Sequence, residues 1–208
     1  MTATSPLSTH HPAEIAPPAP STNPNEAAEH RNEDLIRIFN DLFVDRFATE
    51  LVRGDEEPIY LPANENRALA QVVFAHGYFA SALHEIAHWC VAGRARRRLE
   101  DFGYWYQPDG RTLEQQRAFE RVEVKPQALE WIFSVSCGFR FRFSADNLSG
   151  ANTDMKDFKR AVWRQVHTYL ERGLPKRARI FSRACRSFYG TESQFGPAAF
   201  PDPLTAVP

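Results

Sequence analysis

The segment from Phe79 to Val91 most constrains what this chain can fold into, because it contains the motif H-E-x-x-H as His84-Glu85-Ile86-Ala87-His88. In a helix, residues four apart lie on the same face, about one turn from each other. Two neutral imidazoles placed in this way can hold one divalent ion and leave a third protein ligand to come from elsewhere. Apolar residues recur at helical spacing, and no proline or glycine interrupts the segment before Gly93. We therefore predict a helix over Phe79–Val91 with both histidines facing inward.

Two further helices are predicted downstream of the motif. Thr112 and Gln115 have the spacing of a capping box, which indicates a helix running from there toward Arg121. Pro126 is tolerated near the start of a helix but not in its interior, so a second helix is predicted to begin at about Val124.

Glu123 would then lie at the start of that second helix, with its carboxylate held near a fixed position. By analogy with metal sites of two histidines and one carboxylate, we predict Glu123 as the third ligand of a metal bound by His84 and His88, with Glu120 as the alternative. A glutamate that only complements the helix dipole would look the same in the sequence.

The remaining pattern predicts an α+β fold: a mainly helical single domain with a small β-sheet beside the H-E-x-x-H metal-binding helix. Residues 1–31 are predicted to be a disordered Pro/Ser/Thr-rich tail, 32–190 the metal-dependent domain, and 191–208 a Pro-rich, weakly structured C-terminal tail. Helices are expected over 32–51, with Asn32 as its cap and Gly54 just past its end, and over 154–172 and 175–189. Strands are expected at a sheet edge within 54–62, over 71–75, and over the alternating Phe-Arg-Phe-Arg-Phe of 139–143.

Composition excludes several classes of protein. The net charge of −1 gives no indication of non-specific binding to nucleic acid or membranes, and no apolar run is long enough to span a bilayer. The N-terminus lacks the pattern of a secretory signal. The three cysteines are an odd number without a C-x-x-C pair, which predicts reduced thiols in the cytoplasm.

The motif is compatible with two chemistries. In a zinc peptidase, Glu85 would be the general base that acts on a metal-bound water. In a non-haem iron enzyme, two histidines and one carboxylate leave coordination positions open for dioxygen and substrate, and Glu85 would lie in a second shell or handle protons. The spacing alone does not distinguish the two. A third possibility is a non-catalytic binding module whose metal is structural.

Five stretches resemble the elongation factor P hydroxylase family of bacteria. They run in the same order as in that family and span most of the predicted domain: 54–63 (GDEEPIYLPA), 73–77 (VFAHG), 82–90 (ALHEIAHWC), 101–106 (DFGYWY) and 122–131 (VEVKPQALEW). The resemblance implies a metal-dependent hydroxylase that acts on the lysylated lysine of elongation factor P. It also implies that His84, His88 and Glu123 hold the metal, with Glu85 retained.

Under this hypothesis the metal is Fe(II), dioxygen is the co-substrate, and the protein acts as a monomer on one protein substrate. A long aliphatic substrate arm needs an apolar tunnel, and Tyr104, Trp105, Tyr106 and Trp89 are candidates for its wall, with core packing as the alternative for each. His76 is a candidate for the mouth of the same tunnel, with a buried structural histidine as the alternative.

Overall fold

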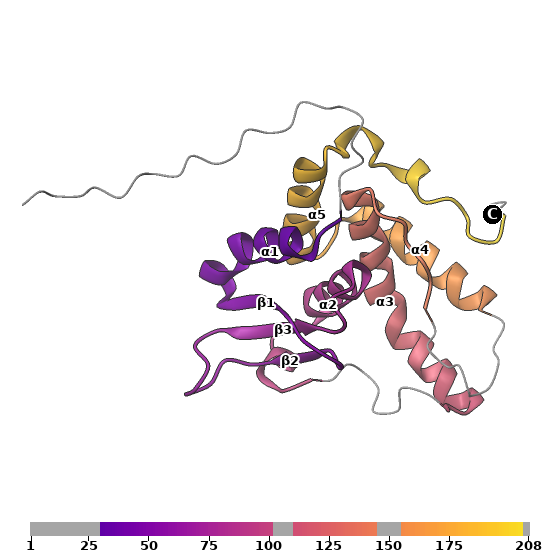
Figure 1. Cartoon of the computed structure of the whole chain (residues 1–208). Helices are drawn as coiled ribbons and strands as arrows, with labels where there is room; N and C mark the ends of the chain where they lie inside the picture. The colour runs from indigo at the N-terminus through magenta and orange to yellow at the C-terminus, as the bar shows by residue number, and fades with distance from the viewer. Residues whose placement is uncertain (1–29, 102–109, 145–154, 206–208) are drawn as a thin grey trace, which may run out of the picture.

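The computed structural model describes residues 30–101, 110–144 and 155–205, and within them it contains five α-helices and a three-stranded sheet (Figure 1). The sheet lies on one side of the molecule. Helices α1 (Asn32–Phe47) and α2 (Phe79–Val91) pack on it, and α3 (Leu113–Cys137) packs in turn against α2, α4 (Lys156–Arg172) and α5 (Lys176–Tyr189). This arrangement confirms the predicted α+β class, and α2 has the predicted bounds.

The sheet is mixed, with strand order β1-β3-β2. The central strand β3 (Ala70–Phe74) pairs in parallel with β1 (Thr49–Arg53) and antiparallel with the edge strand β2 (Ile59–Leu61). Alternate residues of β3 are buried under the helices, as expected for a sheet with one covered face. The predicted edge strand and the predicted strand over 71–75 are therefore confirmed. Because β3 runs directly into α2, the sheet fixes where the H-E-x-x-H helix begins.

The predicted end of the first helix is wrong. Helix α1 ends at Phe47, Ala48 adopts a left-handed conformation with φ of 47°, and the chain continues as β1. Leu51 lies on that strand, and its amide donates a hydrogen bond of 2.8 Å to the side chain of Asn40. Leu51 would face the core whether this segment were a helix or a strand. The apolar pattern therefore did not show that the helix ends and a strand begins.

Two predicted helix-end signals have other roles. Asn32 is the first residue of α1 rather than its cap, and its side chain donates to the carbonyl of Gly77 in the loop before α2. Gly54 follows β1, and its amide donates to the carbonyl of Phe74 at 2.9 Å. A Cβ at Gly54 would lie 2.5 Å from the Val73 side chain, so the close approach of two strands explains this glycine.

Helix α3 is continuous through Pro126, where the sequence predicts two helices. The predicted capping box is present, since Thr112 and Gln115 bond reciprocally. Pro126 leaves one helical carbonyl without its usual donor. The residues that follow it, among them Ala128, Leu129, Ile132 and Phe133, are fully buried against neighbouring helices. Packing of this segment stabilises the helix on both sides of the proline, which a local rule does not capture.

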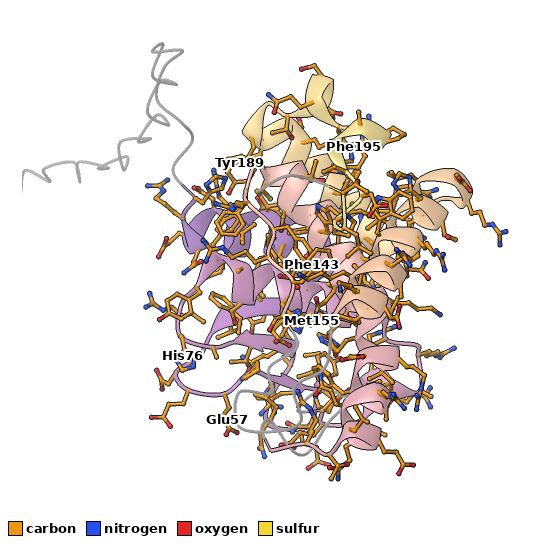
Figure 2. The ribbon with its side chains drawn as sticks, turned by 90° about the vertical axis from the view of Figure 1, so that its right-hand side faces the viewer. Glu57, His76, Phe143, Met155, Tyr189 and Phe195 are labelled. Carbon is orange, nitrogen blue, oxygen red and sulfur yellow. The ribbon has the colours of Figure 1, made fainter. Side chains whose placement is uncertain are left out.

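The segment 139–143 is not a strand. Phe141 and Phe143 pack on Trp131 of α3, with the Trp131 and Phe141 rings stacked at 5.1 Å, and Phe139 packs on Phe79 of α2. The backbone beyond it bonds to a side chain, because Ser144 both donates to and accepts from the amide of Gln127. The alternation therefore reflects an extended strap that lies along α3, with Phe143 at the centre of Figure 2.

The C-terminal segment packs on the domain, where the sequence predicts a weakly structured tail. After α5 the chain forms two short 3-10 turns, Glu192–Gln194 and Pro197–Ala199. Phe200 is 1% exposed, and the indole of Trp163 donates to its carbonyl at 3.0 Å. A large apolar side chain in a proline-rich stretch thus belongs to the core.

None of the helices in the part of the chain that the structure describes is both long and apolar enough to cross a bilayer.

Candidate metal centre

The interface between α2 and α3 brings His84 and His88 together with Glu123. One potential ligand atom from each lies within 4.8 Å of the others. The Nε2 atoms of the two histidines are 2.9 Å apart, and Glu123 approaches them at 3.4 Å from His88 and 3.8 Å from His84. Helix α2 supplies the pair of imidazoles through its four-residue spacing, and α3 supplies the carboxylate from a buried position.

The state of the Glu123 carboxylate fits a bound cation. The residue is 3% exposed, and its Oε2 atom is buried and has no hydrogen-bond partner among the residues that the structure describes. A buried carboxylate oxygen with no donor is costly, and a cation between it and the two Nε2 atoms would satisfy it. Two imidazoles and one carboxylate are suitable ligands for Fe(II) or Zn²⁺. The residues at this interface therefore fit a divalent metal ion.

Glu130 is part of this cluster, although the sequence did not single it out. Its Oε2 atom lies 2.8 Å from Nδ1 of His84, and the residue is 8% exposed. Glu130 and Glu123 are seven residues apart on α3, which places them on one face two turns from each other. That spacing was visible in the sequence, but it does not show which glutamate on this face reaches a histidine.

The charges of the cluster shift the ionisation of its members. Burial by itself lowers the pKa of His84, but the neighbouring Glu130, Glu123 and Glu85 raise it to about 10. Burial raises the pKa of Glu123, yet the two histidines and Arg111 outweigh that effect and lower it. In the metal-free protein, an imidazolium and a carboxylate therefore hold the place that a metal ion and its ligands would take.

Glu85 lies beside the cluster. Burial and the nearby carboxylates raise its pKa, with the two histidines acting in the opposite direction. It is half-buried and lines a cavity of about 30 Å³ together with His88, between α2 and the edge of the sheet. A volume of this size can hold a water molecule. Residues of the sheet and of the segment after α2 complete the cavity: Ile59, Tyr60, Val72, Trp89, Ala92, Arg96, Arg97 and Asp101.

Two other predicted positions have a defined environment. Trp89 is 3% exposed and packs edge-on against Phe39 and Phe47, so it belongs to the core even though it also lines the cavity. His76 is exposed, at the outer edge of the sheet layer (Figure 2), which rules out a buried structural histidine. Its φ of 56° is unusual for a residue with a side chain, and its ring faces Tyr78.

Glu120, the alternative ligand, is not part of the group formed by the two histidines. It is half-buried one turn before Glu123 and accepts a hydrogen bond of 3.2 Å from Gln116. Tyr104, Trp105 and Tyr106, the predicted wall of a substrate tunnel, lie outside the described residues.

Arg111 is a second residue that the sequence did not indicate, since it lies in a segment that reads only as a turn. It is 1% exposed, its Nε donates to Gln116 at 2.8 Å, and its guanidinium lies 3.9 Å from the centre of the Phe119 ring. Its positive charge is one of those that lower the pKa of Glu123.

Comparison with known proteins agrees with this geometry. Residues 38–200 match the model of a family described as elongation factor P hydroxylase. The chain is also 56% identical over 172 residues to the elongation factor P lysine hydroxylase of Haemophilus influenzae, an alignment that covers 83% of this chain and 97% of the relative. The chain belongs to the elongation factor P hydroxylase family.

Proposed function

We propose that this protein hydroxylates a lysine side chain of elongation factor P, with Fe(II) bound by His84, His88 and Glu123 and dioxygen as co-substrate. We further propose that the lysine carries an attached lysyl group, that the protein works as a monomer, and that the reaction takes place in the cytoplasm. One observation supports this most. A chain of this family brings two half-buried imidazoles and a buried carboxylate within 4.8 Å of one another, and one carboxylate oxygen has no hydrogen-bond partner among the described residues.

Bound there, Fe(II) would supply the activation of dioxygen for insertion of an oxygen atom into a C–H bond. The three side chains that hold it come from two packed helices, so packing limits their movement relative to one another. Three protein ligands leave coordination positions open, as a reaction between two co-substrates requires.

Glu85 is assigned to proton handling. It is half-buried beside His88 and lines the same cavity, and burial raises its pKa above that of an exposed carboxyl group, which favours the proton-holding form. In this role Glu85 accepts and releases a proton and does not bind the metal.

The substrate arm is proposed to pass along Tyr104, Trp105 and Tyr106, with His76 near the entrance. The position of Asp101 supports the first part of this proposal. Asp101 lines the cavity, and its backbone pairs with that of Tyr60 through hydrogen bonds of 2.8 and 3.0 Å. The chain therefore leaves the described region at residue 101 from the rim of the cavity that contains Glu85.

The test is the intact mass of lysylated elongation factor P after incubation with this protein, Fe(II) and air. The proposal expects the mass of one added oxygen atom, lost in His84→Ala together with bound metal. His167→Ala is the matched control, since His167 is a half-buried histidine on α4 that contacts Trp163. Full activity in His84→Ala would refute the metal's role. No added oxygen, with zinc-dependent peptide cleavage that Glu85→Gln abolishes, would point to a peptidase.

A further inference from the structure

We propose that Glu130 is a positioning residue for the metal centre: it fixes the ring orientation and tautomer of His84 so that Nε2 faces the ion. This inference rests on the metal site of the proposed function and assigns a role to a residue outside the three ligands.

The hydrogen bond determines which nitrogen of His84 is available. Glu130 Oε2 lies 2.8 Å from Nδ1. A carboxylate only accepts, so Nδ1 of a neutral His84 carries the hydrogen and donates it. The lone pair is then on Nε2, which is the atom that lies 2.9 Å from Nε2 of His88 and 3.8 Å from Glu123. A carboxylate behind a histidine also makes the imidazole a more basic ligand.

The surroundings of Glu130 point to the same role. Its side chain is buried at the α2–α3 interface, and within the described residues His84 is its only hydrogen-bond partner. Burying a carboxylate costs free energy unless a partner offsets the loss of solvation. Here the partner is one of the two histidines of the motif. Helix α3 thus contributes the candidate ligand Glu123 and, two turns later, the carboxylate of Glu130, which aligns His84.

The experiment measures metal affinity rather than activity. The dissociation constant of Zn²⁺ is determined by chelator competition for the full chain, for Glu130→Ala, and for Glu130→Gln, whose amide oxygen can still accept from Nδ1. Loss of such a hydrogen bond typically weakens metal binding about 10- to 100-fold, which is expected for Glu130→Ala. Glu130→Gln is expected to bind Zn²⁺ more tightly than Glu130→Ala. Glu114→Ala, an exposed glutamate in the first turn of the same helix, should bind Zn²⁺ like the unaltered chain.

A second readout separates positioning from a general effect on folding. In the zinc-loaded protein, the Nδ1 proton of His84 should give a slowly exchanging, downfield NMR resonance that disappears in Glu130→Ala. The visible spectrum of the Co²⁺-loaded variant should also change.

Folded Glu130→Ala that binds Zn²⁺ as tightly as the unaltered chain, with the same Co²⁺ spectrum, would overturn the proposal. If Glu130→Ala does not fold, Glu130→Leu decides, because leucine fills a similar space but cannot accept from Nδ1: unchanged Zn²⁺ affinity in that variant overturns the proposal. Failure of the unaltered chain to bind Zn²⁺, Co²⁺ or Fe(II) would instead refute the metal site of the proposed function.

Discussion

Replacing Arg177 by alanine should destabilise the protein through the end of the metal-site helix. Helix α2 ends without a glycine cap, at Ala92 with φ of −57°, so its last carbonyls need donors from elsewhere. Arg177 of α5 supplies them: its Nη2 lies 2.8, 3.2 and 2.7 Å from the carbonyls of Trp89, Cys90 and Ala92. Its guanidinium also lies 4.6 Å from the centre of the Trp89 ring.

The magnitude follows from the donors available. Nη2 carries two hydrogens, so three carbonyls share two hydrogen bonds, each worth about 1.5–3 kcal/mol when the donor is charged. The cation–π contact adds about 0.5–2 kcal/mol. These terms together come to at least about 3.5 kcal/mol. Because water can reach part of this helix end once the side chain is removed, we expect a somewhat smaller loss, of about 3 kcal/mol. For a domain of this size that corresponds to a decrease in Tm of about 6–12 °C.

Thermal unfolding followed by circular dichroism measures this effect. Arg179→Ala is the matched control, since Arg179 is exposed two residues further along α5 and its removal should change stability by about 0.5 kcal/mol at most. A Tm of Arg177→Ala within about 2 °C of the control would show that solvent replaces Arg177 at this helix end, and the reasoning would be wrong.

Three further predictions concern the metal centre and the fold. In the metal-free protein the pKa of His84 is raised from 6.5 to about 10, so its ion pairs stabilise the fold fully below about pH 6.5 and their contribution is lost as the pH rises toward 10. A metal must displace that proton, so chelator competition should show Zn²⁺ affinity rising about tenfold per pH unit between pH 7 and 9, and a flat profile would contradict the assignment. Phe200→Ala should lower the free energy of unfolding by about 3–5 kcal/mol in urea titrations, against about 1 kcal/mol or less for Phe188→Ala, which is 44% exposed; equal losses would show that the C-terminal segment contributes little. Pro126→Ala should remove the cost of proline in a helix interior, which is about 3 kcal/mol for the missing hydrogen bond and the ring clash together, and should lose about 1–2 kcal/mol of buried ring contacts. A higher urea midpoint is therefore expected, and a lower one would mean that ring packing dominates.

The sequence predicted the helix of the motif and the strand before it, because both signals are local. Residues 79–91 have one continuous apolar stripe, and β3 precedes them in the chain by a short loop. The same locality explains the errors. The rule for proline takes no account of the buried residues that follow Pro126 and stabilise the helix. The alternation of 139–143 indicates an extended segment, but it does not show whether a partner strand lies beside it.

The sequence predicted that the two histidines of the motif and Glu123 lie together, and their binding of a metal stays a prediction. Glu123 was favoured for a helix start that does not exist, yet it joins the two histidines because the continuous α3 carries it to the α2 interface. Glu130 and Arg111 were missed, since hydrogen bonding to His84 and complete burial of an arginine both depend on how α2 and α3 pack.

If His84, His88 and Glu123 bind the ion of the proposed function, their division between two helices links the lifetime of the protein to the supply of that ion. The unfolded chain offers His84 and His88 close together in sequence, but Glu123 joins them only when α2 and α3 are packed. An ion that prefers the three-residue site therefore stabilises the native state by mass action, by about 2.7 kcal/mol at a free concentration one hundred times its dissociation constant. Under metal starvation the fraction of unfolded chains would rise about a hundredfold, and proteases that degrade unfolded chains would lower the abundance of the protein. Cells short of the ion would then lose the enzyme itself as well as its activity.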